Sequence, residues 1–127
     1  SFETSGKTQL SVMQVVGPDI SKYGVIAKGD RPGVVLGIME KPSLEEAPSD
    51  MASIGRYILN PDIFDVLRDL PVGFGGEIQL SDAINIQAKQ GKVNSVTSTA
   101  LRFDCGSVDG FLEAIMHASI LRSSDNN

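Results

Sequence analysis

The sequence has little of what disulfide frameworks and soft-metal sites require. Among its 127 residues there is one cysteine, Cys105, and one histidine, His117. A single cysteine excludes an internal disulfide and any zinc site of the finger type, which needs at least two thiolates. A single histidine likewise excludes a multi-histidine metal site.

Long apolar runs and an excess of positive charge are also missing. The longest apolar stretch, 33–39, is far shorter than the roughly 20 residues of a membrane-spanning helix, and the first residues contain no apolar segment of a signal peptide. Eleven Lys and Arg face 16 Asp and Glu, giving a net charge of −5, which disfavours nucleic-acid binding because that depends on neutralising phosphates. We therefore expect no membrane or nucleic-acid partner and a reducing, cytoplasmic location. One phosphorylated small molecule held by one or two cations remains compatible with this charge.

What is present suits one folded domain. Apolar residues make up 41% of the chain, enough to build a hydrophobic core at this length. We expect the domain to cover residues 1–122 and the polar residues 123–127 to form a frayed tail.

Hydrophobic periodicity predicts strands in the first half and mainly helices in the second. Runs of β-branched residues between Gly and Pro predict strands, and apolar residues at helical spacing predict helices. The expected strands are 10–16, 23–27, 34–39, 52–59 and 93–99, and the expected helices are 61–70, 81–90 and 109–122. This order gives neither regular βαβ alternation nor a clean layered arrangement.

Several details of these elements can be predicted. The stretch 34–39 is apolar enough for a strand covered on both faces. Asn60 and Ser81 are the expected N-caps of the first two helices, and Gly91 the expected end of the second. The buried stripe of the last helix is expected to consist of Phe111, Leu112, Ile115, Met116 and Ala118.

The pair Glu40-Lys41 stands at the end of an apolar strand, directly before Pro42. Adjacent strand residues point to opposite faces, so the pair can share a ligand only where the chain bends. Pro42 predicts such a bend and biases Lys41 toward extended geometry. A carboxylate accepts hydrogen bonds from sugar hydroxyls, and an ammonium group suits a phosphate. The alternative is a solvated strand end.

Asp104 lies between a strand and the last helix, where ligands often bind in α/β proteins. Its carboxylate suits Mg²⁺; the alternative is an aspartate that caps its own turn before Gly106. Cys105 has no obvious activating base, so we expect a buried spectator thiol, and His117 is expected to be structural. The glycines in 73–76 are a weak phosphate-loop signal and more typical of a flexible connection.

Taken together, these motifs resemble one known family. The carrying segments are 22–25 (Lys-Tyr-Gly-Val), 39–42 (Met-Glu-Lys-Pro), 54–59 (Ile-Gly-Arg-Tyr-Ile-Leu), 76–84 (Gly-Glu-Ile-Gln-Leu-Ser-Asp-Ala-Ile) and 104–106 (Asp-Cys-Gly). Their order and spacing resemble the C-terminal half of bacterial UTP–glucose-1-phosphate uridylyltransferases, which are sugar-1-phosphate nucleotidylyltransferases. The resemblance covers about residues 2–122. It implies an α/β fold, the C-terminal part of a Rossmann-like nucleotidyltransferase with a mixed sheet, strands first and then helices.

The resemblance also implies a reaction and roles for individual residues. UTP and glucose 1-phosphate would give UDP-glucose and pyrophosphate, with Mg²⁺ as cofactor. Glu40 would bind glucose hydroxyls, and Lys41, the catalytic residue, would bridge the sugar phosphate and the α-phosphate. The backbone at Gly24 and Gly55 would approach the sugar, and Asp104 would stand by the metal.

One part of the family pattern is missing. The family's N-terminal half carries a glycine-rich loop that holds the nucleotide, and the glycines in 73–76 stand in the wrong place for it. We therefore expect a fragment without a nucleotide pocket, inactive alone. It should self-associate as a homo-oligomer through an unpaired sheet edge and an exposed apolar face. The alternatives are a non-catalytic module of this fold that binds sugar phosphates or partner subunits, and a transferase for another sugar or nucleotide.

Overall fold

The fold is built on one mixed sheet followed by helices, as expected from the sequence. The computed structural model describes residues 2–72 and 77–124. Along the chain the elements are α1 (Phe2–Ser5), β1 (Thr8–Gln14), the 3-10 helix η1 (Pro18–Lys22), β2 (Gly24–Lys28), β3 (Val35–Glu40), β4 (Met51–Ile58), α2 (Ile63–Asp69), α3 (Leu80–Lys89), β5 (Val93–Thr97) and α4 (Val108–Ser124). Every predicted strand and helix is present, with shifted ends; the short α1 and η1 were not predicted.

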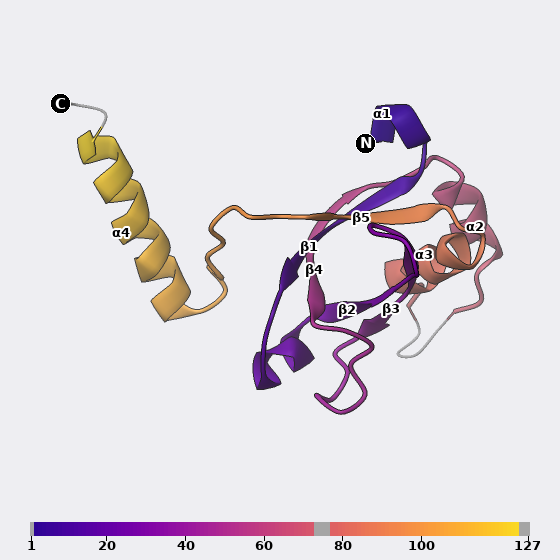
Figure 1. Cartoon of the computed structure of the whole chain (residues 1–127), viewed down its shortest axis with the longest axis horizontal. Helices are drawn as coiled ribbons and strands as arrows, with labels where there is room; N and C mark the ends of the chain where they lie inside the picture. Colours follow the sequence, from indigo (N-terminus) through magenta and orange to yellow (C-terminus); the bar gives the residue numbers. More distant parts are fainter. Residues whose placement is uncertain (1, 73–76, 125–127) are drawn as a thin grey trace.

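The five strands are ordered β3-β2-β4-β1-β5. Only β1 and β5 run parallel among the ladders of the described residues, and the other neighbours are antiparallel. Directly before β3 the chain returns to β5: Val34 forms a bridge with Asn94, and the Ser95 amide donates to the Gly33 carbonyl at 2.7 Å. The sheet therefore curls back on itself, as Figure 1 shows.

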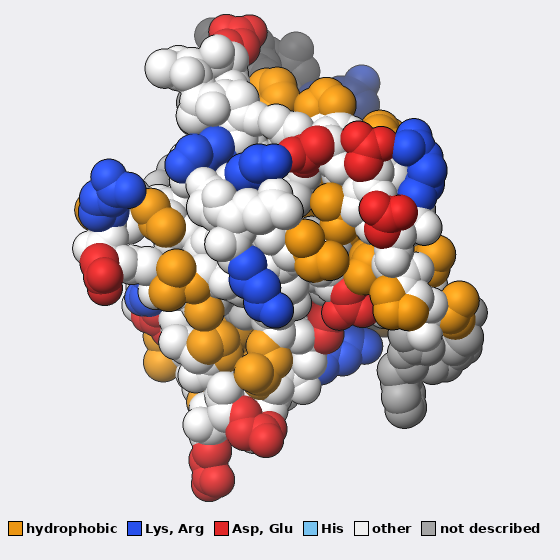
Figure 2. All heavy atoms as spheres, turned by 90° about the vertical axis from the view of Figure 1, so that its right-hand side faces the viewer, with side chains coloured by type: hydrophobic (Ala, Val, Ile, Leu, Met, Phe, Trp, Pro, Cys, Tyr) orange, Lys and Arg blue, Asp and Glu red, His pale blue; other side chains and the backbone are white. Residues whose placement is uncertain are grey.

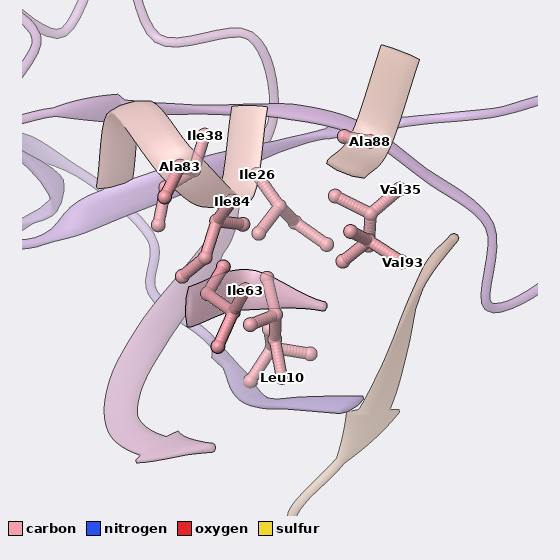
Figure 3. Close-up of a cluster of buried hydrophobic side chains, with 10 residues drawn as sticks. Leu10, Ile26, Val35, Ile38, Ile63, Ala83, Ile84, Ala88 and Val93 are labelled. Carbon is pink, nitrogen blue, oxygen red and sulfur yellow. The ribbon is translucent and has the colours of Figure 1, made fainter. Parts of the chain in front are cut away.

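The hydrophobic core lies between this curled sheet and the helices α2 and α3 (Figure 3). Strand residues alternate, so every second side chain of β1 and β2 points inward, while α2 and α3 add side chains from one face. The buried cluster consists of Leu10, Val12, Ile26, Val35, Ile38, Ile63, Ala83, Ile84, Ala88 and Val93. Burying one large aliphatic side chain contributes about 1.5–3 kcal/mol, so this cluster holds α3 firmly against the sheet.

A partly buried network of polar groups connects the start of α2 to β1, α3 and the residue before β5. Thr8 Oγ1 donates to Gln87 Oε1 at 2.7 Å, and Gln87 Nε2 donates to the Asp62 carboxylate. Lys92 Nζ lies 2.6 Å from Asp62 Oδ2, and the backbone amide of Asn60 donates to Thr8 Oγ1 at 3.0 Å. Hydrogen bonding by Lys92 is the main reason that the pKa of Asp62 lies below its usual range. Each buried polar group of this network thus has a hydrogen-bond partner, as burial requires.

The third strand is less covered than the sequence predicted. Leu36 and Met39 are 58% and 46% exposed, so the prediction of a strand buried on both faces is wrong. The reason is that β3 lies at the edge of the sheet and its pairing with β2 skips Leu36, because Ala27 pairs with Gly37 and Lys28 with Val35. Asn85 of α3 protects its backbone: Asn85 Oδ1 accepts from the Ile38 amide at 2.7 Å, and Asn85 Nδ2 donates to the Ile38 carbonyl at 3.0 Å.

The predicted ends of the first two long helices are partly corrected. Helix α2 begins at Ile63 with Asp62 as N-cap, so the assignment of Asn60 as N-cap is wrong; Asn60 Oδ1 instead accepts from the Asp62 backbone amide at 3.0 Å in the turn before the helix. Helix α3 begins one residue before Ser81, with Gln79 as N-cap and no capping hydrogen bond from its side chain. The assignment of Ser81 as N-cap is therefore wrong. Gly91 follows the C-cap of α3 with φ 70°, which confirms its predicted place.

The last helix does not pack on the sheet. Figure 1 shows α4 standing apart at the end of an extended segment. Its large apolar side chains, Val108, Phe111, Leu112, Ile115, Met116, Ile120 and Leu121, are all more than half exposed, and Ala118 is exposed as well. The predicted buried stripe is therefore wrong, because the described residues offer no surface that covers this helix.

Two smaller predictions concern the same end of the chain. The rings of His117 and Phe103 lie 5.3 Å apart, so the histidine joins α4 to the preceding segment, consistent with a structural role. Helix α4 continues into the predicted tail as far as Ser124, and residues 125–127 lie outside the described residues. None of the helices in the described ranges has the length and apolarity needed to cross a bilayer.

Candidate functional site

Glu40 and Lys41 line one hollow at the end of β3. The hollow has a volume of about 650 Å³, and its other lining residues, Gln79, Ser81 and Asp82, come from the start of α3 and the residue before it. Small-molecule sites typically have volumes of about 300–1,000 Å³. The hollow therefore has room for a molecule of the size of a hexose phosphate.

The backbone at Lys41 explains why two adjacent side chains share this hollow. Lys41 has φ 46°, in the left-handed region that side-chain-bearing residues rarely adopt. Its amide donates to the Tyr23 carbonyl at 3.0 Å, and the next residue, Pro42, is buried. These anchors hold a bend that ends the strand alternation. The predicted bend is confirmed, whereas the predicted extended conformation of Lys41 is wrong.

Gly24 belongs to the same corner of the molecule. It pairs with Glu40 across the β2–β3 ladder. A Cβ atom at Gly24 would lie 3.1 Å from Glu40 Oε1 and 3.3 Å from Oε2, closer than most real Cβ contacts. The absence of a side chain at Gly24 therefore makes room for the Glu40 carboxylate.

The charges at the hollow are mixed. Glu40 and Asp82 are acidic and Lys41 is basic, and the side chains of Glu40 and Lys41 have no hydrogen bond or ion pair within the described part of the chain. Carboxylates can accept from sugar hydroxyls, and the ammonium group can neutralise a phosphate. On the face seen in Figure 2, acidic and basic side chains are interspersed with apolar ones, without a large field of one sign. A small ligand with both hydroxyls and a negative charge fits this hollow better than an extended polyanion does.

Gly55 does not line this hollow. It lies in β4 with φ 76°, where the β1–β4 register shifts between Leu10 and Val12. A glycine in the left-handed region is typical of a β-bulge, so the bulge is a structural reason for glycine here. An approach of its backbone to a sugar stays a prediction.

Asp104 is also outside the lining of the hollow. Its side chain is exposed, and its Oδ1 accepts from the Gly106 amide at 3.1 Å, the contact expected of a turn-capping aspartate. The segment around it contacts Tyr23, the residue before Gly24, because Arg102 Nη1 donates to the Tyr23 hydroxyl at 3.3 Å. The structure thus brings together Gly24, Glu40 and Lys41 and leaves Asp104 on a neighbouring segment.

Three residues that line the hollow were not predicted from the sequence. Gln79, Ser81 and Asp82 lie in the segment 76–84 that carried part of the family resemblance, and this was the available signal. The interpretation of residues 73–76 as a flexible connection falls on residues that the structure does not describe.

Cys105 is exposed, so the expectation of a buried thiol is wrong. Within residues 2–72 and 77–124, no three His, Cys, Asp or Glu side chains come together as a metal site. A cation at Asp104 would therefore depend on ligands other than a cluster of this chain's carboxylates.

Comparisons with known proteins agree with the resemblance. A family model described as nucleotidyl transferase matches residues 2–119. The chain is 47% identical over 110 residues to a UTP–glucose-1-phosphate uridylyltransferase of Pseudomonas aeruginosa, covering 84% of this chain and 39% of that protein. It thus spans about two fifths of the length of the curated relatives it matches.

Solved structures give the same picture. The fold matches an apo UDP-glucose pyrophosphorylase with a TM-score of 0.84 and 38% identity, covering 95% of this chain and 45% of that one. It matches a UDP-glucose pyrophosphorylase complexed with UDP-glucose with a TM-score of 0.77 and 40% identity, covering 89% and 44% of the two chains. The predicted mixed sheet and element order are therefore confirmed.

Proposed function

The chain belongs to the nucleotidyl transferase family, and on that premise we propose that it forms the sugar-phosphate-binding part of a UTP–glucose-1-phosphate uridylyltransferase. One observation carries the proposal: the left-handed backbone of Lys41 directs adjacent acidic and basic side chains into one hollow. A relative of Pseudomonas aeruginosa with this activity is 47% identical over 110 residues.

The proposed chemistry is an in-line transfer. A phosphate oxygen of glucose 1-phosphate attacks the α-phosphorus of UTP, and the bond from this phosphorus to the bridging oxygen breaks, so pyrophosphate leaves with its electron pair. Lys41 neutralises charge on the sugar phosphate and the α-phosphate, and Glu40 accepts from glucose hydroxyls. Gly24 lets the sugar and the Glu40 carboxylate approach the backbone, and the bulge at Gly55 offers a second backbone approach. Positioning and charge neutralisation supply most of the acceleration in such reactions.

Asp104 is the proposed contact to a divalent cation, Mg²⁺. Mg²⁺ is usually held by one or two carboxylates together with substrate phosphates and waters, so one exposed carboxylate on a turn fits this requirement. When bound, Mg²⁺ would withdraw charge from the phosphates. The chain's own contribution is to present the Asp104 carboxylate on a turn fixed by the Gly106 amide.

Three further points belong to this proposal. The partners are glucose 1-phosphate and UTP, and the reaction takes place in the cytoplasm. The chain forms homo-oligomers, which the exposed apolar side chains of α4 and the edge strand β3 favour. Light scattering coupled to gel filtration tests this, and a mass of 13.5 kDa at all concentrations would exclude self-association.

A binding experiment tests the sugar site without requiring turnover. Glucose 1-phosphate is titrated into the ¹⁵N-labelled 127-residue chain, with glucose and inorganic phosphate as separate probes. We expect saturable shifts at Gly24, Glu40 and Lys41 with glucose 1-phosphate and weaker effects from either fragment. Unchanged spectra at those amides would contradict the proposal.

An activity experiment separates the enzyme from the alternatives. Residues 2–119 replace the matching segment of the Pseudomonas aeruginosa relative, and pyrophosphate release is measured with sugar phosphates and nucleotides varied. We expect turnover with UTP and glucose 1-phosphate, and none from the 127-residue chain alone. A folded chimera that binds the sugar phosphate without turnover would favour a binding module, and preference for another substrate pair would favour another branch.

A further inference from the structure

The two walls of the Glu40–Lys41 hollow come from different elements. One wall is the end of β3, with Glu40 and Lys41, and the other is the start of α3, with Ser81 and Asp82. The hydroxyl of Ser81 and the carboxylate of Asp82 can both bind sugar hydroxyls, so a sugar held by Glu40 faces them across the hollow. The fit of such a ligand therefore depends on how α3 lies along β3.

Apolar contacts hold α3 against β3. Ile38 of β3 belongs to the same buried cluster as Ala83 and Ile84 of α3 (Figure 3). Hydrophobic stabilisation follows the apolar area removed from water and has no direction of its own. These contacts therefore resist separation of the helix from the strand, and they define its position along the strand less sharply than hydrogen bonds do.

Asn85 of α3 provides the directional contact. Its Oδ1 accepts from the Ile38 backbone amide at 2.7 Å, and its Nδ2 donates to the Ile38 carbonyl at 3.0 Å. Gly37 makes room for this arrangement, because a Cβ atom there would lie 3.1 Å from Asn85 Oδ1. Such hydrogen bonds are about 2.7–3.2 Å long and neighbouring strand residues are about 3.3 Å apart, so a shift of α3 by one strand residue would break both bonds.

The contact lies next to the residues that line the hollow. Asn85 is four residues after Ser81 and three after Asp82, so the three side chains are neighbours on one face of α3. Its partner Ile38 is two residues before Glu40 in β3. Asn85 is not itself a lining residue. Any effect of Asn85 on a ligand thus acts through the two walls that it connects.

We propose that Asn85 is a positioning residue for the sugar-phosphate site. It sets the position of α3 along β3, and thereby the distance between the Glu40–Lys41 wall and the Ser81–Asp82 wall. Its role rests on the proposed function, because the ligand that meets both walls is the glucose 1-phosphate proposed above.

Ligand discrimination separates positioning from stability. Glucose 1-phosphate and inorganic phosphate are titrated separately into the ¹⁵N-labelled 127-residue chain and into Asn85→Ala, at a temperature where circular dichroism shows both to be folded. The sugar phosphate needs both walls, whereas phosphate needs Lys41 alone. We expect Asn85→Ala to weaken glucose 1-phosphate binding about tenfold and phosphate binding less than about twofold. A loss of stability alone would weaken both by the same factor, because only the folded fraction binds.

Gln87→Leu is the matched control. Gln87 lies in the same helix, bonds to Thr8 and Asp62, and is not a lining residue of the hollow. Its replacement should destabilise the fold at least as much as Asn85→Ala and leave the ratio of the two dissociation constants at its wild-type value. Asn85→Asp keeps an acceptor for the Ile38 amide, so it should give a smaller change in this ratio, and it replaces Asn85→Ala if that variant does not fold.

Nuclear Overhauser contacts test the same role without a ligand. Contacts between the methyl groups of α3 and β3 report how the helix lies along the strand. We expect them to change in Asn85→Ala and to keep their wild-type pattern in Gln87→Leu.

Several results would overturn the proposal. They are wild-type affinity for glucose 1-phosphate in folded Asn85→Ala, an equal loss for glucose 1-phosphate and phosphate, and a change of their ratio in Gln87→Leu as large as in Asn85→Ala. Unchanged Overhauser contacts in Asn85→Ala would overturn it as well. If the wild-type chain does not bind glucose 1-phosphate, the proposed function is what fails, and the Overhauser contacts alone then decide whether Asn85 positions α3.

Discussion

The Glu40 carboxylate occupies the space that a side chain at Gly24 would need. The two residues are partners in the β2–β3 ladder, and a Cβ atom at Gly24 would lie 3.1 Å from Glu40 Oε1 and 3.0 Å from Ile38 Cδ1. The carboxylate therefore has its position because Gly24 has no side chain. The close approach of Gly24 and the Glu40 carboxylate therefore connects the interior of β2 to the proposed sugar site.

Gly24→Ala should separate binding from stability. The added methyl group would lie 3.0 Å from Ile38 Cδ1 and 3.1 Å from Glu40 Oε1, so the end of the Ile38 side chain and the exposed Glu40 carboxylate must each move by a few tenths of an ångström. We expect a change in the free energy of unfolding of less than about 1 kcal/mol and a loss of affinity for glucose 1-phosphate of about tenfold, or about 1.4 kcal/mol. Chemical denaturation and calorimetric titration measure the two quantities. Wild-type affinity in a folded Gly24→Ala variant would remove this contact from the site.

Replacing Lys41 should reveal a conflict between stability and binding. A residue other than glycine in the left-handed region costs about 1–3 kcal/mol, and Lys41 has φ 46°. We therefore expect the free energy of unfolding of Lys41→Gly to exceed that of Lys41→Ala by about 1 kcal/mol. Chemical denaturation measures this difference. Neither variant should bind glucose 1-phosphate. The comparison between these variants is the control, because both remove the ammonium group and only one relieves the backbone.

Gln87→Leu should be the most destabilising of these substitutions. Gln87 is fully buried and joins Thr8 to Asp62, so leucine leaves the Thr8 hydroxyl without an acceptor and one oxygen of the Asp62 carboxylate without a donor. A group left unsatisfied in this way costs about 1–3 kcal/mol, and urea unfolding measures the loss. The same change at the exposed Gln90 should alter the free energy of unfolding by less than about 0.5 kcal/mol. Equal changes in the free energy of unfolding at Gln87 and Gln90 would show that the hydrogen bonds of Gln87 to Thr8 and Asp62 do not stabilise the fold.

Asn85→Leu should expose the edge of the sheet. Asn85 satisfies both the amide and the carbonyl of Ile38 on the edge strand β3, and leucine satisfies neither. We expect a loss of about 1–2 kcal/mol, faster hydrogen exchange at the Ile38 amide, and more aggregation, since unpaired edges recruit other strands. Asn85→Asp keeps an acceptor for the amide but faces the carbonyl with negative charge. It should therefore retain slow exchange at the Ile38 amide while losing stability.

The sequence predicts those parts of the fold that depend on local patterns. Every predicted strand and helix exists because alternation and helical spacing in this chain agree with its turns and caps. The bend after Glu40 was predictable from Pro42, but the left-handed backbone of Lys41 was not, because it depends on a buried Pro42 and a hydrogen bond to Tyr23.

Features that depend on distant parts of the chain were missed for a related reason. The exposure of Phe111 and Ile115 follows from the position of α4 away from the sheet, and an apolar helix has the same pattern whether or not a partner covers it. Gln79 and Asp82 reach the Glu40–Lys41 hollow only because α3 packs beside β3. No spacing along the sequence contains that contact.

The stability of the fold should depend on pH through Asp62. Its pKa lies below the usual range because Lys92 Nζ donates a hydrogen bond to Oδ2 at 2.6 Å, and Gln87 donates to the other oxygen. Since the folded-state pKa is the lower one, this contribution is complete above the unfolded pKa and is lost as pH falls through the folded value. The loss should therefore occur below about pH 4. With the Asp62 side chain 32% exposed, solvent screening should keep it below about 1 kcal/mol.

Urea unfolding of wild type and of Asp62→Asn, measured from about pH 7 down to about pH 2.5, isolates this effect. Carboxylates titrate in the acidic part of that interval, at roughly pH 2–5. The pKa values of Asp50 and Glu46 are also lowered, by hydrogen bonds from Lys28 and Ser43 respectively, so wild type alone would report several groups. The difference between the two proteins cancels those groups. We expect the stability advantage of wild type over Asp62→Asn to shrink as pH falls, because protonation weakens the contact with Lys92 in wild type alone. A difference that stays constant down to pH 2.5 would mean that the ion pair with Lys92 does not contribute to folding.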